Sequence, residues 1–477
     1  MESHPPGLYV LSTLEMWERF SFYGMEALLF LFALNVLNCS MEFASIIFGV
    51  YTGLTFLTPV FGGYLSDKYL GNRKSIYIGG ILMALGQFAL TFSASLYNPA
   101  VKIPIHSSFI FSTQEIFLIL GLLILVIGNG FFKANISSLV RFLYVEDDER
   151  LDSAFTLFYM GINIGSFLSP IIIGLLIGTT HPELYQYGFL LSGLGLIAGL
   201  LIFTVFKNKY VISPEGDLVG IEPSSKSKRE KLIEKEKELG HESKTKLTKI
   251  EKDRIKAIFL LALFTVLYWS ASEQSATSLM YFAQSFMAKT IAGITFPLEW
   301  YQSINPLGVV LFAPILAGLW MKLSDMGKEP SIPIKMGIGM LLLAVSFVII
   351  LPAGIQADNG IFNIPVFYLI LVNTVQAVAE LCISPTGQSL VAKLSPVRYS
   401  SLMMGIWYMA TAVAEIIGAL TAGLYPVAGN PTPYFLGLIP IPNLEAFFLI
   451  FIIVSAFIGM LAFIFKGRII HLMHGIE

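Results

Sequence analysis

The chain has 477 residues, of which 55% are hydrophobic and only 13% are charged, and its mean hydropathy is +0.73. A soluble globular protein carries roughly 25% charged residues. This composition therefore excludes a soluble enzyme and indicates a membrane protein. The length leaves room for about a dozen spanning helices of ~20 residues each, which excludes a single-span receptor. The net charge of −2 gives no sign of a nucleic-acid partner.

Apolar stretches separated by charged or Gly/Pro-rich breaks predict twelve membrane-spanning helices. The six in the first half are expected at about 13–37, 43–65, 75–97, 114–140, 153–180 and 184–206. The six in the second half are expected at about 256–284, 297–323, 332–354, 364–393, 399–426 and 441–465. The fold class that follows is an all-α membrane protein with two six-helix bundles.

The two sets of spans are joined by a charged segment. Residues 207–255 are dense in Lys and Glu and have almost no apolar periodicity, which is typical of a water-exposed linker. Within it, residues 225–240 form either a flexible tether, which we favour, or a solvated helix with charge pairs four residues apart. We therefore expect an N-terminal bundle over 1–206, the linker over 207–255 and a C-terminal bundle over 256–477.

The positions of the basic residues predict the orientation of the chain. With both termini placed inside, 26 of the 30 Lys and Arg residues lie in cytoplasmic loops or tails, and only Lys102 and Lys289 lie outside. Basic residues concentrate on the cytoplasmic side of membrane proteins. We therefore expect a multi-pass protein of the plasma membrane with cytoplasmic termini. The first ten residues lack the pattern of a cleaved signal peptide.

Ionisable side chains fall inside the predicted spans, where each costs ~2.5 kcal/mol or more at the bilayer centre. Eight such residues would together exceed the stability of a typical protein, so they must face one another or a water-filled cavity. Six are acids and two are bases, so they cannot all pair. This surplus of carboxyls indicates proton coupling. The eight are Glu15, Glu18, Arg19, Glu26, Lys133, Glu273, Glu380 and Glu415, and Glu299 lies at the start of a span.

The first predicted span concentrates these residues on one face. At ~100° per residue, six side chains occupy a stripe about 140° wide. Glu15 and Arg19 are partners four residues apart, and Glu26 lies ~16 Å from Glu15, near mid-membrane. A network at the helix end that reaches the cytoplasm is an alternative for the first three residues, but Glu26 is too deep for it. The stripe comprises Glu15, Glu18, Arg19, Phe22, Tyr23 and Glu26.

Several motifs resemble those of known transporters. The loop GGYLSDKYLGNRK, residues 62–74, resembles the signature between the second and third helices of the major facilitator superfamily. EMWERFSFYG, residues 15–24, resembles the ExxERFxxYG signature of the proton-dependent oligopeptide transporter (POT, or PTR) family. Further resemblances to this family's motifs occur on the expected spans at residues 130–137, 158–165, 269–274, 300–306, 380–385 and 404–407.

The resemblance implies a proton-coupled symporter that imports di- and tripeptides by alternating access between two bundles. It implies a proton-coupling network of Glu15, Glu18, Arg19 and Lys133, with Glu273 in a gate opposite the position of Glu26. It implies that Lys133 attracts the substrate carboxylate and that Glu380 holds the substrate ammonium. It also implies that Asn163 and Asn305 hydrogen-bond the peptide backbone, and that Tyr23, Trp269 and Trp407 wall the pocket.

Four positions depart from the family pattern. Glu26 replaces an Arg, Phe22 and Phe56 each replace a Tyr, and Ala134 replaces a Pro. The predicted pocket thereby loses one cation and two hydroxyls and gains a carboxylate. We expect Phe22 and Phe56 to contact substrate, and Glu26 with Glu273 to form a second protonatable site. A proton-coupled transporter of another small organic solute, cationic or neutral, is the alternative function.

The remaining expectations concern partners. We expect no cofactor besides the coupling proton and no metal, with small peptides and the lipid bilayer as partners and a monomer as the working unit. No nucleophile arrangement, metal cluster or Walker motif is visible, so an enzyme is disfavoured. A membrane sensor or scaffold is a further alternative from a different class.

Overall fold

The computed structural model describes residues 4–98, 112–145, 150–177, 181–221, 248–291, 293–395 and 400–474. The first half contains α1 (Pro6–Asn35), α2 (Met41–Leu65), α3 (Asn72–Ser95), α4 (Thr113–Arg141), α5 (Leu151–Ile177) and α6 (Tyr185–Tyr210). The second half contains α8 (Lys249–Ser272), α9 (Ser278–Phe286), α10 (Trp300–Asp325), α11 (Ile332–Asp358), α12 (Phe367–Leu394), α13 (Ser400–Ala422) and α14 (Leu444–Met473). The predicted stretch 225–240 lies outside the described residues.

Short elements connect the long helices. A π-helical turn, η1 (Ser66–Leu70), follows α2, and the 3-10 turns η2 (Pro182–Leu184) and η3 (Glu273–Ser275) precede α6 and separate α8 from α9. Two small antiparallel hairpins lie between helices, β1 (Thr290–Ile291) with β2 (Ile294–Thr295), and β3 (Tyr434–Phe435) with β4 (Ile439–Pro440). In the first hairpin Thr290 pairs with Thr295, and in the second Tyr434 pairs with Pro440.

The described helices confirm the expected all-α architecture. Eleven helical segments in the described part of the chain are long and apolar enough to cross a membrane. The segment α1 is missing from this set, although it has 30 residues and lies among the other helices, because four ionisable side chains interrupt its apolar sequence. The seventh span, expected to be continuous, is instead broken at Glu273, where η3 separates α8 from α9.

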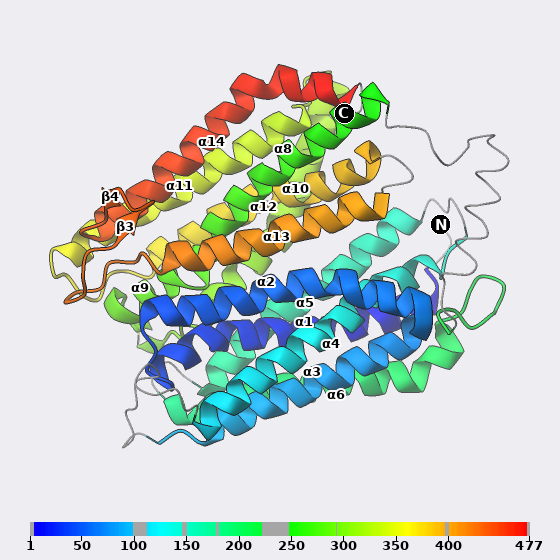
Figure 1. The fold of residues 1–477 in the computed structure, drawn as a ribbon, viewed down its shortest axis with the longest axis horizontal. Coiled ribbons are helices and arrows are strands. Elements are labelled where there is room, and N and C mark those ends of the chain that lie inside the picture. The colour runs from blue at the N-terminus through cyan, green and yellow to red at the C-terminus, as the bar shows by residue number, and fades with distance from the viewer. Residues whose placement is uncertain are drawn as a thin grey trace.

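The helices form two groups with the same internal arrangement (Figure 1). In the first half, α1 packs against α5 and α6, α3 packs against α4 and α6, and α2 packs against α4. In the second half, α8 packs against α13 and α14, α11 packs against α12 and α14, and α10 packs against α12. The same contacts thus recur in the same order. Between the halves, α2 packs against α13 and α5 packs against α10.

Helix ends follow capping chemistry rather than hydropathy. The prediction started the seventh span at residue 256, whereas α8 starts at Lys249. Thr248 and Glu251 form a reciprocal capping box there, which satisfies backbone N–H groups outside the apolar stretch. The polar first turns of α8 therefore lie beyond the apolar stretch that hydropathy detects.

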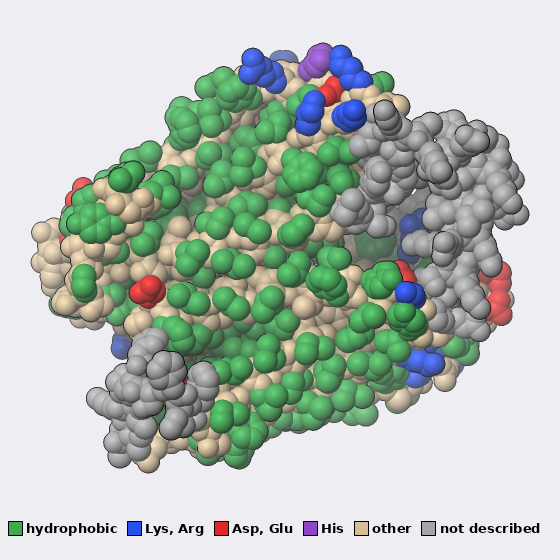
Figure 2. Space-filling model, viewed as in Figure 1, with side chains coloured by type: hydrophobic (Ala, Val, Ile, Leu, Met, Phe, Trp, Pro, Cys, Tyr) green, Lys and Arg blue, Asp and Glu red, His purple; other side chains and the backbone are tan. Residues whose placement is uncertain are grey.

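Basic side chains gather at one end of the molecule. Figure 2 shows hydrophobic side chains over the flank of both halves, and most of the visible Lys and Arg at the end where Figure 1 places both chain termini. Lys466 and Arg468 lie in the last turns of α14, and Lys207 and Lys209 in the last turn of α6. We refer to this end as the linker end and to the opposite end as the distal end. The cytoplasmic location of the linker end stays a prediction.

Glycines bring helix backbones into contact within the first half. A Cβ atom added at Gly62 of α2 would overlap the backbone of Gly130 on α4. Likewise, a Cβ at Gly79 of α3 would lie 2.5 Å from the carbonyl oxygen of Gly128 on α4. Backbone atoms cannot rotate away as side chains can, so these positions admit only glycine without a shift of the helices.

We expect Gly62→Val to lower the midpoint of thermal unfolding by several degrees in detergent solution, because overpacking costs roughly 1–3 kcal/mol. Gly318→Val on α10 is the matched control, since nothing lies within 4 Å of an added Cβ there. Equal shifts in the two variants would show that the α2–α4 contact is not tight.

Candidate functional site

A cavity of about 320 Å³ lies between the two halves. Helices from both halves contribute to it, which places it at the centre of the molecule. The cavity wall contains nearly all the residues singled out from the sequence. These are Glu15, Arg19, Phe22, Tyr23, Glu26, Phe56, Lys133, Asn163, Trp269, Glu273, Asn305, Glu380 and Trp407. Their roles in binding and proton coupling stay predictions.

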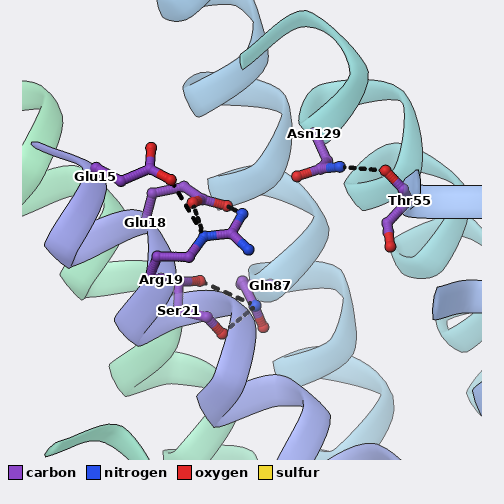
Figure 3. A network of polar contacts seen from close by, with 7 residues as sticks. All are labelled: Glu15, Glu18, Arg19, Ser21, Thr55, Gln87 and Asn129. Atoms are coloured by element: carbon purple, nitrogen blue, oxygen red, sulfur yellow. Dashed lines mark hydrogen bonds and ion pairs between the residues drawn. The ribbon is translucent and has the colours of Figure 1, made fainter. Parts of the chain in front are cut away.

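The stripe on α1 faces the cavity as its periodicity predicted, with one difference in pairing. Figure 3 shows Glu15, Glu18 and Arg19 converging in one network. Arg19 donates to both oxygens of Glu18, from Nε at 2.5 Å and from Nη2 at 2.7 Å, whereas the Arg19–Glu15 pair is looser at 3.5 Å. The bidentate geometry makes Glu18 the main partner of Arg19. Glu18 itself lies behind Arg19 and is not part of the cavity wall.

Burial separates this network from the helix-end alternative. Glu15, Glu18 and Arg19 are 3%, 1% and 3% exposed, so their charges do not reach water at the end of the helix. The Oε2 atom of Glu15 has no hydrogen-bond partner among the described residues. A buried carboxyl with a vacant acceptor at the cavity wall is chemically suited to accept a proton or a donor group from a ligand.

Neighbouring polar contacts hold α1 and α2 in position. Gln87 of α3 donates to the hydroxyl of Ser21 on α1 at 3.1 Å, and Asn129 of α4 donates to the carbonyl of Thr55 on α2 at 2.7 Å (Figure 3). Both donors are almost fully buried. Such bonds fix the rotation of each helix about its axis, which aims the stripe on α1 at the cavity.

The two basic residues of the cavity lie on the first half and are already engaged. Lys133 of α4 places its Nζ atom 4.6 Å from the centre of the Phe56 ring, which is cation–π geometry. Arg19 is bound by Glu18 and lies 4.7 Å from the centre of the Phe22 ring. The resemblance implies a tyrosine at each of these two positions, and the structure places each phenylalanine against a cation.

Acidic residues dominate the opposite wall. Glu273, Glu380 and Glu415 line the cavity from the second half, where no Lys or Arg takes part in the described wall. Asn305 contributes a side-chain hydrogen bond to the carboxyl of Glu380. Glu26 faces this wall from α1, and its Oε2 atom has no partner among the described residues. The cavity is therefore polarised, with its bases on one half and most of its acids on the other.

The halves touch at the distal end. Gln284 of α9 donates to Asn35 of α1 at 2.6 Å, and the indole of Trp300 on α10 donates to the carbonyl of Ile171 on α5 at 3.2 Å. On the other side of the molecule, a Cβ added at Gly49 of α2 would overlap Ala419 of α13. Contacts on both sides thus close the cavity toward the distal end.

The same helices separate toward the linker end. On α2, Gly53 still contacts α13, but Val60 and Tyr64 further along that face are 42% and 60% exposed. On α10, Ser303 donates to the carbonyl of Phe167 at 2.9 Å, whereas Leu307 and Pro314, further along that face, are exposed. The cavity is therefore accessible from the end that carries both termini.

Sequence reasoning missed several residues of the wall. Tyr159, Gln302, Asn373, Gln376, Ser384, Tyr408 and Thr411 line the cavity and were not singled out, and Glu415 was noted only as an ionisable residue. A signal was present on α12, where Asn373, Gln376, Glu380 and Ser384 are spaced by three, four and four residues. That spacing puts polar side chains on one face of an otherwise apolar helix, which predicts a shared orientation toward a cavity.

Comparison with known structures defines the class of protein. The fold matches the crystal structure of peptide transporter POT in complex with sulfate, with a TM-score of 0.81 and 27% sequence identity over 99% of this chain and 96% of that one. Twelve spans in two similar halves around a central cavity, with α8 and α9 counted as one span, are the architecture of major facilitator transporters. The molecule is thus a membrane transporter of this fold.

The sequence comparisons specify the family. The profile of the POT family matches residues 73–432. An uncharacterized transporter, YclF, of Bacillus subtilis is 32% identical over 92% of each chain. A di-/tripeptide transporter of Lactococcus lactis subsp. cremoris is 30% identical over 98% of this chain and 96% of its own. The chain belongs to the POT family.

Proposed function

We propose that the chain is a proton-coupled symporter that imports di- and tripeptides across the plasma membrane by alternating access. The observation that carries the proposal is the central cavity, closed at the distal end and accessible from the linker end, with buried charges of opposite sign on its two halves. If the linker end is cytoplasmic, this conformation faces inward. A zwitterion that crosses the bilayer needs a cation and an anion to replace its hydration, and such a cavity supplies both.

The proposed roles follow the positions of the side chains. Lys133 attracts the peptide carboxylate from the first half, and Glu380 holds the ammonium from the second half. Asn163 and Asn305 bind the peptide backbone, while the aromatic rings of the wall enclose the side chains. Glu15, Glu18 and Arg19 form the proton-coupling network, in which Arg19 holds Glu18 and leaves one oxygen of Glu15 free. The name of the relative from Lactococcus lactis supports peptides as the cargo.

Uptake should be electrogenic and driven inward by protons. One proton that crosses with a neutral zwitterion gains ~2.3 kcal/mol per 100 mV, and one pH unit adds ~1.4 kcal/mol, which together allow roughly 500-fold accumulation. The measurement is uptake of radiolabelled dialanine into liposomes that contain the purified chain. A protonophore together with a potassium ionophore collapses both gradients. Concentrative uptake that persists after this collapse would contradict proton coupling.

The second candidate is a transporter of a different small organic solute, cationic or neutral. The polarised cavity favours it, because five carboxyls face only two bases in the described wall and both bases are engaged. A net acidic site attracts cations and repels carboxylates. The same liposomes discriminate the two functions when single amines and uncharged solutes are added as competitors, alongside unlabelled peptides. Inhibition by amines and failure of peptides to compete would favour the second candidate.

A further inference from the structure

A buried carboxyl at the distal end lies outside the cavity wall. Glu299 directly precedes α10 and is 1% exposed. Neither of its carboxyl oxygens has a hydrogen-bond partner among the described residues, apart from a contact with the backbone of Glu299 itself. An ionised carboxyl buried without a partner costs far more than a neutral one. The packing of α10 alone therefore gives no reason for a glutamate at this position.

Glu299 lies where the two halves touch. Trp300, the next residue, makes the hydrogen bond between α10 and α5 described above. On the first half, Tyr185 of α6 interacts electrostatically with Glu299, and its hydroxyl accepts a hydrogen bond from Asn35 at 3.2 Å. Asn35 in turn accepts the bond from Gln284 of the second half. Glu299 thus interacts electrostatically with a polar chain that crosses the closed end.

Few charged groups are available near this carboxyl. The stretch of α5 that faces α10, residues 167–174, has no titratable side chain. The hairpin that precedes α10 carries Lys289, which is exposed and forms no described ion pair with Glu299. On α12, Tyr368 accepts a hydrogen bond from Gln356. Among the described residues, Tyr185 is the titratable neighbour that interacts electrostatically with Glu299.

The consequence of burial is a change in proton affinity. Desolvation raises the pKa of Glu299 to about 7, and the contact with its own backbone opposes this rise only in part. If α10 moved away from α5, water would reach the carboxyl and its pKa would return toward the ordinary value of ~4.3. The proton affinity of Glu299 thus depends on whether the distal end is closed.

We propose that Glu299 is a proton-binding residue of the transport cycle, separate from the carboxyls of the cavity. It takes up a proton from the water at the distal end as the halves close there and returns it to the same side when they open. This proton is not carried across the membrane. It therefore changes the equilibrium of closing without changing the number of protons that accompany each substrate. The proposal rests on the alternating access of the proposed function, but it needs neither peptide binding nor symport.

The sign of the pH effect follows from linkage. Between pH ~4.3 and ~7 the open form has lost the proton of Glu299 and the closed form retains it, so closing consumes one proton. The ratio of closed to open molecules then falls by up to about tenfold per pH unit as the pH rises. Below this window both forms are protonated, and above it both are ionised, so the contribution of Glu299 is constant in each range.

The test measures the distal end directly. Spin labels at Tyr187→Cys and Lys289→Cys, two exposed sites on opposite halves, report its opening by pulsed electron spin resonance distances. The background replaces Cys39 and Cys382 by Ala, and the full chain is embedded in lipid nanodiscs without peptide. We expect the closed population to fall from pH 4.5 to pH 7.5. In Glu299→Gln the number of protons taken up on closing should decrease by about one, and the closed form should persist at higher pH.

Controls separate this effect from damage to the fold. Glu183→Gln removes an exposed carboxyl at the same end and should leave the slope unchanged. Glu299→Met is a second neutral variant, which lacks the unpaired amide of Gln and should behave alike. An unchanged pH slope in both neutral variants would overturn the proposal. Glu299→Gln should also retain concentrative uptake in liposomes. Failure of the unmodified chain in that assay would count against the proposed function and leave the distance measurement intact.

Discussion

Replacement of Glu15 or Glu18 by Gln is expected to abolish proton-driven uptake while counterflow exchange survives. A carboxyl that cannot ionise cannot take part in a cycle of proton binding and release, yet the substrate-bound halves can still exchange between conformations. Glu18 holds Arg19 through two hydrogen bonds, and Glu15 presents a free oxygen to the cavity. We expect loss of more than nine-tenths of gradient-driven uptake in each variant. Uptake and counterflow of labelled dialanine in liposomes measure the two activities separately.

Lys133→Ala should lose both activities, because it removes the proposed carboxylate-binding cation and the partner of the Phe56 ring. Glu445→Gln is the matched control for the two glutamate variants, since this carboxyl is exposed at the start of α14. Full gradient-driven transport by the Glu15, Glu18 and Lys133 variants alike would show that these residues have a purely structural role.

Glu26→Arg is expected to strengthen dipeptide uptake several-fold. The substitution places a cation opposite Glu273 and Glu415, where the charged side chains of the described cavity wall are carboxyls only. A charge-assisted pair would replace three acids whose like charges oppose one another. The concentration dependence of dialanine uptake measures the effect, and the gain should appear chiefly as a lower KM.

Glu26→Gln separates the loss of an acid from the gain of a base. Removal of one like charge lets the remaining carboxyls ionise more easily, so the pH optimum of uptake should move to lower pH. Glu26→Leu tests whether a polar group is needed there. An unchanged pH profile in Glu26→Gln, together with no gain in Glu26→Arg, would show that Glu26 takes no part in coupling or recognition.

Hydropathy was sufficient to predict the fold. Each predicted span except the seventh corresponds to one helix, because twenty apolar residues cross a bilayer only when their backbone groups bond internally. The helix ends were less predictable. A helix continues beyond its apolar stretch wherever a capping residue hydrogen-bonds its first backbone N–H groups, as Thr248 does for α8. The break at Glu273 and the two hairpins were not predicted. Their causes are local backbone geometry and contacts between halves, which periodicity does not register.

Prediction of the site succeeded where residues share one helix and was weaker where they do not. The stripe on α1 faces the cavity because residues three and four apart share a helix face. Spacing also suggested Glu15 as the partner of Arg19, whereas Glu18 holds it more closely. Rotamers decide such a choice, and spacing does not encode them. Glu299 was visible as an acid at the start of a span, but its position between the halves required the packing of α10 on α5.

The polarity of α1 has a consequence for the insertion of the protein into the membrane during synthesis. This helix leaves the ribosome before the other described helices, and each charge at the centre of a lone helix opposes insertion by ~2.5–3.5 kcal/mol on translocon scales. The helices that bury it, α5 and α6, begin at Leu151 and Tyr185. At 5–20 residues per second, α6 begins to emerge roughly 8–30 seconds after α1 is complete. The charges of α1 therefore oblige the membrane insertion machinery to shelter it until its partners arrive.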